Sequence, residues 1–301
     1  MPTYNCENYI EKSILSVINQ TYKKWELIII NDGSTDNTLK ICQKYSKKNP
    51  KIKVYTQTNS GVSYSRNRGI NICNGDYISF LDSDDTYHQD FLRKLLNSVQ
   101  TKNILYDASY CGFNRYINNH FSNTSQIFQK NGNIIYDYLN FLKKQKHILS
   151  ICSVLISSSF LKHNNIKFNN GKTNGEDTAF LIKLLALANV NACPENLFEY
   201  RLGRVDSATN NPSEKAAISI LESYTEARDF LSKIKENTNI LTSIDDLTNK
   251  EFQYWLYYSI KKRNVKLFNE LKKYNKKSII LPWFFYKIIR PYIKLYLKFK
   301  L

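Results

Sequence analysis

The chain has 301 residues, of which 42% are hydrophobic and 23% charged, with nine glycines and six prolines. This composition is typical of globular proteins and excludes wholly disordered, collagen-like and low-complexity chains. The chain has 43 Lys and Arg but only 26 Asp and Glu, so its net charge is +17. This charge favours nucleic acid, anionic lipid or phosphorylated small molecules as partners.

The six cysteines are scattered along the chain, and no two of them form a C-x-x-C pair. This spacing favours reduced, buried structural residues over catalysis or metal binding. The sequence has no signal-peptide pattern and no apolar run of the roughly 18 residues that a membrane-spanning helix needs. We therefore expect a cytoplasmic protein, or one attached to the membrane from the cytosolic side.

The first hundred residues alternate between helical and strand patterns. Apolar residues at a 3.6-residue spacing predict a helix over 7–19, and the apolar run 25–30 predicts a strand buried on both faces. Further along, we predict helices over 34–48 and 63–71, and strands over 52–55 and 77–81. This alternation predicts an α/β fold with a Rossmann-like, mostly parallel sheet flanked by helices, which binds ligands at the carboxyl ends of its strands.

Beyond residue 100 the pattern changes from alternating to helical. We predict strands over 108–117, 148–157 and 196–200 and a helix over 177–188. From residue 214 the pattern is almost purely helical, so we expect an α/β domain over 1–210 and a helical region over 211–301. Residues 261–301 contain 13 Lys and Arg and a single acid, Glu270, which gives this segment +12 of the +17.

An acidic loop, Asp82-Ser83-Asp84-Asp85, directly follows the predicted strand 77–81. Carboxylates two residues apart in a loop can hold a hard divalent cation and leave positions open for water and substrate phosphates. The alternative is a solvated turn or a helix cap.

Three other segments carry candidate site residues. Asp32 lies just after the predicted strand 25–30. There it can accept a hydrogen bond from a nucleotide base or a ribose hydroxyl, or simply cap the next helix. Arg66 and Arg68 point to different faces of one predicted helix, so only one of them is expected to reach the ligand edge. Glu176 and Asp177 begin another helix, where a carboxylate is either an N-terminal cap or a general base.

In this order the segments resemble the bacterial family-2 inverting glycosyltransferases, which have a GT-A fold. The resemblance rests on residues 2–5, 18–22, 25–36, 61–69 and 75–85, and more weakly on 175–177. It implies a nucleotide-sugar donor, most often a UDP-sugar, held with Mn²⁺ or Mg²⁺. It also implies transfer with inversion to a saccharide acceptor, commonly lipid-linked, in surface polysaccharide synthesis.

The resemblance assigns donor-binding roles residue by residue. Thr3 and Tyr4 would flank the base, Asp32 would contact it, and Arg66 would help to hold the nucleotide. Asp82 would lie near the ribose and the sugar.

The resemblance also assigns the metal and the base. Asp84, with Asp82, would bind the metal that bridges the diphosphate, and Asp177, with Glu176 beside it, would be the general base. Many relatives carry a His where this chain has Arg204, which cannot ligate a metal but can neutralise the diphosphate directly. The family also has a short apolar strand ahead of Pro2, so we hypothesise that the native start lies upstream of Met1.

The carboxyl-terminal tail has a basic stripe at helical spacing, formed by Lys287, Arg290, Lys294 and Lys298. With the aromatic and aliphatic residues between them, it is typical of a helix lying on an anionic membrane surface. The alternative is a helix packed on the domain with its lysines reaching into solvent.

Two other classes of function compete with the transferase. Nucleic-acid binding is disfavoured because no reading motif is present and the acidic loop would repel phosphate, so we expect no nucleic-acid partner. A catalytically inactive membrane-surface scaffold of the same fold is the remaining alternative.

Overall fold

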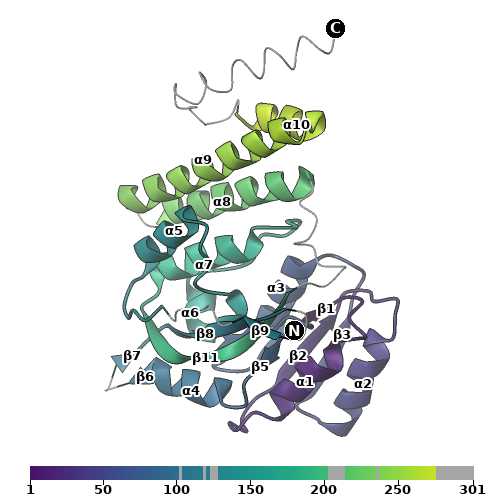
Figure 1. The fold of residues 1–301 in the computed structure, drawn as a ribbon. Coiled ribbons are helices and arrows are strands. Elements are labelled where there is room, and N and C mark those ends of the chain that lie inside the picture. The colour runs from purple at the N-terminus through teal and green to yellow at the C-terminus, as the bar shows by residue number, and fades with distance from the viewer. Residues whose placement is uncertain (102–103, 118–119, 123–127, 203–213, 235–236, 276–301) are drawn as a thin grey trace.

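The computed structural model describes residues 1–101, 104–117, 120–122, 128–202, 214–234 and 237–275 (Figure 1). Within this part of the chain, two larger sheets and a two-stranded ladder of β6 (Gln100–Thr101) and β7 (Ile104–Leu105) pack with helices. The long C-terminal helices lie together above the sheets in Figure 1.

The amino-terminal sheet is parallel throughout, with strand order β1-β2-β3. Its strands and the helices that follow them are β1 (Pro2–Thr3), α1 (Ile10–Ile18), β2 (Leu27–Asn31), α2 (Thr38–Lys48), β3 (Ile52–Thr56) and α3 (Val62–Ile72). Thr3 pairs with Asn31, and Asn31 pairs with Thr56, so the carboxyl ends of the strands are level. The predicted helices and strands of this region are confirmed.

The second sheet is mixed, with strand order β4-β10-β8-β11-β5. A sixth strand, β9, also pairs with β8 but lies outside this order. These strands are β4 (Tyr77–Ser79), β5 (Thr86–Tyr87), β8 (Ala108–Ile117), β9 (His120–Ser122), β10 (Val154–Ser157) and β11 (Val190–Leu202). Among the described strands of this sheet, only β8 and β11 pair in parallel. The α/β class is confirmed, but fewer strands are parallel than expected, because β10 enters between β4 and β8 in the opposite direction.

Several elements differ from the sequence prediction. The predicted strand 148–157 begins as a 3₁₀ helix, η1 (Ile151–Ser153), and only β10 is extended. Three helices were not predicted, namely α4 (Phe91–Val99), α5 (Ile135–Lys143) and α6 (Ser158–His163). In α4 the buried residues Phe91, Leu95 and Val99 recur every four residues, a helical signal that was available in the sequence.

The C-terminal helices are α8 (Glu214–Ile234), α9 (Thr238–Lys261) and α10 (Val265–Asn275), and α8 packs on α7 (Glu176–Leu187). Of these, α8 and α9 share the main core with the sheets, whereas the buried residues of α10 pack in a second apolar cluster with α8 and α9. Buried residues of α8 and α9, such as Tyr224 and Ile244, belong to the same apolar cluster as the sheet residues. The boundary predicted near residue 210 lies outside the described residues and stays a prediction. None of the described helices is both long and apolar enough to cross a membrane.

The cysteines are free thiols, and all except the half-buried Cys73 are buried, as predicted. Burial raises the pKa of Cys42 to about 12 and that of Cys152 well above its usual value, so these thiols stay neutral. They therefore serve as small packing residues.

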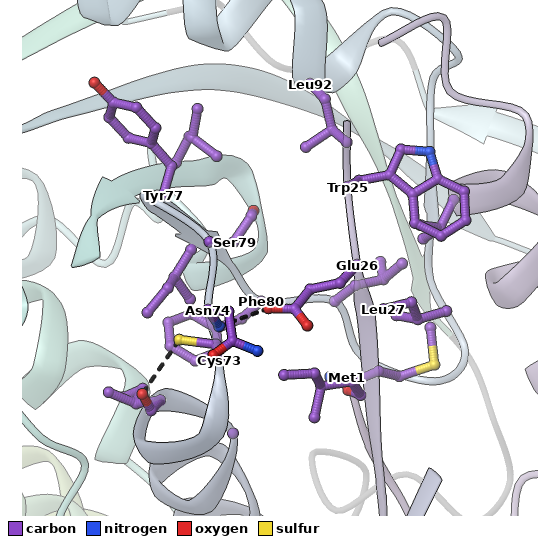
Figure 2. A pocket seen from close by; sticks show the side chains of 18 of the residues that line it. Met1, Trp25, Glu26, Leu27, Cys73, Asn74, Tyr77, Ser79, Phe80 and Leu92 are labelled. Atoms are coloured by element: carbon purple, nitrogen blue, oxygen red, sulfur yellow. Dashed lines mark hydrogen bonds between the residues drawn. The ribbon is translucent and has the colours of Figure 1, made fainter. Parts of the chain in front are cut away.

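A cavity of about 340 Å³ lies between β2 and β4 (Figure 2). These two strands belong to different sheets, since β4 pairs with β10 whereas β2 pairs with β1 and β3. The cavity wall includes Trp25, Leu27 and Tyr77, and the backbone N–H of Asn74 donates to Glu26 Oε1 at 2.6 Å on the same wall. Most of the residues that line this cavity are apolar.

Two glycines provide a matched test of packing. Gly69 lies inside α3 on the cavity wall, and a Cβ there would meet no atom within 4 Å. We expect Gly69→Ala to stabilise the fold by about 0.5–1 kcal/mol, because Ala is the better helix former. The melting temperature should rise by roughly 2 °C.

Gly175→Ala is the contrasting variant. Gly175 has φ +82°, and its Cβ would lie 2.9 Å from Ile220 Cα on α8. We expect a loss of about 1–3 kcal/mol from overpacking, read in the same thermal unfolding experiment. Equal melting temperatures for the two variants would contradict this account of the helix contact.

Candidate active site

The acidic candidate site residues lie just after strands of both sheets and at the start of α7. Asp32 directly follows β2, the acidic loop lies just beyond β4, and Asp177 is the second residue of α7. Arg66 on α3 joins two of these segments, since it forms ion pairs with both Asp82 and Asp177. Arg66 and Asp177, which one of these ion pairs joins, lie 111 positions apart in the sequence.

The Arg66 guanidinium is the centre of an acidic cluster. Its Nη2 donates to Asp82 Oδ1 at 2.8 Å, its Nη1 donates to Asp177 Oδ1, and Nη1 lies 3.9 Å from Glu176 Oε1. The ring centre of Phe168 is 5.1 Å from the guanidinium carbon. Arg66 is only 3% exposed. Its positive charge is therefore offset by the neighbouring carboxylates rather than by water.

Helix α7 begins at a turn that only glycine fits well. Gly175 adopts the left-handed conformation, and α8 lies too close to admit a side chain. Ser219 Oγ on α8 accepts hydrogen bonds from the backbone N–H groups of Thr173 and Asn174 at 3.0 and 3.2 Å. The same hydroxyl donates to Asn174 O at 2.9 Å. The C-terminal helical region therefore determines where Asp177 lies.

The two carboxyl groups at the start of α7 differ in exposure. The side chain of Asp177 is 38% exposed, whereas that of Glu176 is 12% exposed. Although the Asp177 side chain is partly exposed, the protein packed around its carboxyl group displaces water and raises its pKa to about 7. The Arg66 guanidinium opposes this rise, and the Glu176 and Asp82 carboxylates add to it. Burial likewise raises the pKa of Glu176. A carboxyl group that titrates near neutral pH is suited to accept a proton from a hydroxyl.

The acidic loop is held by α1 and by β11. Ser13 Oγ donates to Ser83 O at 3.0 Å and to Asp85 O at 2.7 Å. The backbone N–H of Arg201 donates to Asp85 Oδ1 at 2.8 Å, and Arg201 Nε donates to Asp84 O at 3.2 Å. Burial raises the pKa of Asp85 well above its usual value. The hydrogen bond from the Arg201 N–H gives this residue a structural role in the loop.

Asp82 and Asp84 carry the carboxylates that are predicted to bind a divalent cation. Both are half-buried, and their carboxylate oxygens are the ligands that Mg²⁺ and Mn²⁺ prefer. Among the described residues, Asp82, Asp85 and Cys152 also bring ligand atoms within 4.8 Å of one another. The neutral, buried thiol of Cys152 is a poor ligand for a hard cation. Asp82 and Asp84 therefore stay the predicted ligands of the cation.

Asp32 organises the loop that precedes α3. Its Oδ1 accepts from Gln57 Nε2 at 2.8 Å and from the Ser60 N–H at 2.9 Å, and its Oδ2 accepts from the Gly61 N–H at 2.8 Å. It is 4% exposed. Its predicted contact with a nucleotide base stays a prediction, and the structure adds a role in holding this loop.

The other predicted donor residues differ in accessibility. Thr3 is buried at the end of β1, and Tyr4 beside it is exposed. Both lie at the edge predicted to hold the base, and their contacts with it stay predictions. Arg204 lies outside the described residues.

Arg201 lies beside the acidic loop but is not among the candidate site residues predicted from the sequence. Its guanidinium carbon lies 5.4 Å from the ring centre of Tyr9 and 5.1 Å from that of Tyr116, beside the acidic loop. Its position at the end of the strand predicted over 196–200 was the available signal. Nothing in the sequence places the two tyrosine rings around it, because they come from distant segments.

The fold is of the GT-A type. The model of the family described as Glycosyl transferase family 2 matches residues 1–163, which is more than half of the 301 residues. The chain therefore belongs to this family. The predicted family and fold are confirmed.

Individual relatives agree with this assignment. An uncharacterized glycosyltransferase of Haemophilus influenzae is 36% identical over 189 residues, covering 62% of this chain and 70% of that protein. The minor teichoic acid biosynthesis protein GgaB of Bacillus subtilis is 35% identical over 198 residues, covering 62% of this chain. The match spans only 20% of the length of GgaB.

The fold is shared with a solved structure. The crystal structure of S. aureus TarS 1–349 in complex with UDP-GlcNAc superposes with a TM-score of 0.71 and 21% identity. The superposition covers 90% of this chain and 77% of that chain. At this level of identity the likeness shows the fold.

Proposed function

We propose that this protein is an inverting glycosyltransferase that moves a sugar from a UDP-sugar to a hydroxyl of a lipid-linked saccharide acceptor in bacterial surface polysaccharide synthesis. The observation that carries the proposal is the convergence of the acidic loop with Asp177 through Arg66. The UDP-GlcNAc bound by TarS supports the donor, and the teichoic acid role of GgaB supports the pathway.

The arrangement suits a single displacement at the anomeric carbon. The acceptor oxygen forms a bond to this carbon while the bond from the carbon to the UDP diphosphate breaks. Asp177 accepts the proton of the acceptor hydroxyl. Because the acceptor oxygen attacks from the face opposite the departing UDP, an α-linked donor yields a β-linked product. A divalent cation held by Asp82 and Asp84 would supply the positive charge that offsets the negative charge growing on the leaving diphosphate.

The proposed donor class is tested by nucleotide binding. The purified protein is heated with UDP, GDP, dTDP and CMP, each with and without Mn²⁺. We expect UDP alone among them to raise the melting temperature substantially, and Mn²⁺ to enlarge the shift, because ligands that bind only the folded state stabilise it. The absence of any shift, in a protein shown to be folded, would favour the inactive scaffold.

We also propose that the protein attaches to the inner face of the cell membrane through its basic tail. Lys287, Arg290, Lys294 and Lys298 lie outside the described residues, so their arrangement stays a prediction. Attachment to the membrane would bring the site close to a lipid-linked acceptor.

Removing the tail tests the attachment. We expect a chain that ends at Ile279 to bind anionic vesicles at least about a hundredfold more weakly, since each basic residue near such a surface contributes about 1 kcal/mol. Co-sedimentation with anionic vesicles measures this loss, and neutral vesicles serve as the control. Unchanged binding to anionic vesicles would show that the tail is not the anchor.

A further inference from the structure

Arg66 lies behind the acids of the site. It is 3% exposed, whereas the side chains of its partners Asp82 and Asp177 are 32% and 38% exposed. A ligand that approaches the open side therefore meets the carboxylates before it meets the guanidinium. This arrangement does not suit direct contact between Arg66 and a nucleotide.

The guanidinium fixes the two carboxylates relative to each other. Its two terminal nitrogens bind one oxygen of Asp82 and one oxygen of Asp177. The planar fork of Arg holds both partners at one separation, which a lysine ammonium cannot do in the same way. Within the described part of the chain, Oδ1 is the oxygen of Asp177 that is engaged, which leaves Oδ2 to accept a proton.

Arg66 is itself firmly placed. It lies on α3, and the ring centre of Phe168 is 5.1 Å from its guanidinium carbon. Asn67, the next residue of α3, is tied to the same segment, because its Nδ2 donates to Phe168 O at 2.9 Å and its Oδ1 accepts from the Phe168 N–H at 2.9 Å. Helix α3 and the chain ahead of α7 are thus locked together next to Arg66.

We propose that Arg66 is a positioning residue, which aligns the donor-side carboxylate Asp82 with the proton acceptor Asp177 and does not itself bind the nucleotide. This inference rests on the proposed transferase function. It differs from the role in nucleotide binding that the sequence resemblance implies, so the two roles predict different kinetics.

The test compares Arg66→Lys and Arg66→Ala with Arg68→Lys. Arg68 lies on the same helix, but its Nη1 donates to Thr56 O and Gln57 Oε1, away from the acidic cluster. For each protein we would measure kcat, the KM values of donor and acceptor, the Kd of UDP with Mn²⁺ by calorimetry, and the melting temperature.

We expect kcat of Arg66→Lys to fall by about a hundredfold, because a misplacement of about 1 Å at a reacting group can cost that much. The Kd of UDP should stay within threefold of the wild-type value, and Arg68→Lys should keep wild-type kcat. Added guanidinium should partly restore kcat of Arg66→Ala. If Arg66→Ala does not fold, Arg66→Lys still decides between the two roles.

Three outcomes would overturn the inference. UDP affinity that falls in step with kcat would assign Arg66 to nucleotide binding. A loss of kcat that disappears when the variants are assayed well below their melting temperatures would assign Arg66 to fold stability. An unchanged kcat would show that Arg66 has no role in turnover. In contrast, a wild-type protein that transfers no sugar from any donor would refute the proposed function, and the positioning role with it.

Discussion

Replacing Asp177 with Asn should lower kcat by about a thousandfold, because a positioned general base contributes roughly 10² to 10⁴ in rate. Asn keeps the shape of the side chain and an oxygen to accept from Arg66, but it cannot take the proton of the acceptor hydroxyl. UDP binding should remain close to that of the wild-type protein, since Asp177 is proposed to act on the acceptor. Steady-state kinetics together with UDP calorimetry measure both quantities.

Glu176→Gln is the matched control for this variant. Glu176 is the adjacent carboxyl group, but its side chain is more buried and lies 3.9 Å from Arg66. We expect its loss of kcat to be no more than about tenfold, below the range for a general base. A larger loss in Glu176→Gln than in Asp177→Asn would exchange the roles of the two residues.

The pH dependence provides a separate test of the same base. Burial raises the pKa of Asp177 to about 7, and a base must be deprotonated to act. Therefore kcat/KM should fall as pH drops below about 7, approaching a tenfold loss per pH unit. The residual activity of Asp177→Asn should lack this acidic limb. Wild-type activity that stays flat down to pH 5 would contradict the assignment.

The second large effect is expected at Asp84. Asp84→Asn removes one proposed carboxylate ligand, and even the loss of a group that only orients a ligand weakens metal sites by about 10- to 100-fold. We therefore expect a loss of roughly a hundredfold or more in Mn²⁺-dependent turnover. The melting-temperature shift with UDP should become independent of Mn²⁺.

Asp90→Asn is the control for Asp84→Asn. Asp90 lies six residues further along, where its Oδ1 accepts from Thr21 Oγ1 at 2.7 Å and pairs with Arg93 Nη2 at 2.8 Å, away from the acidic cluster. It should keep the wild-type response to Mn²⁺. If Asp84→Asn retained that response as well, the cation would have to bind elsewhere.

Local patterns predicted the amino-terminal sheet and its helices well. The run 25–30 became β2, and the helical spacing over 34–48 and 63–71 became α2 and α3. The same patterns placed Asp32 and the acidic loop near strand ends, because a residue that follows a buried strand must emerge at the edge of the sheet. The pattern was weaker beyond residue 100, where α5 and α6 were missed and β10 was found only in part.

The sequence by itself determined the family, the main elements of the first sheet and the identity of the acids that could do the chemistry. Only the tertiary structure decided that Arg66 lies between Asp82 and Asp177, and that Arg201 lies beside the acidic loop. It also explained Gly175, which is required by the approach of Ile220 from α8. Helix and strand patterns depend on residues a few positions apart, whereas these contacts depend on how distant segments pack.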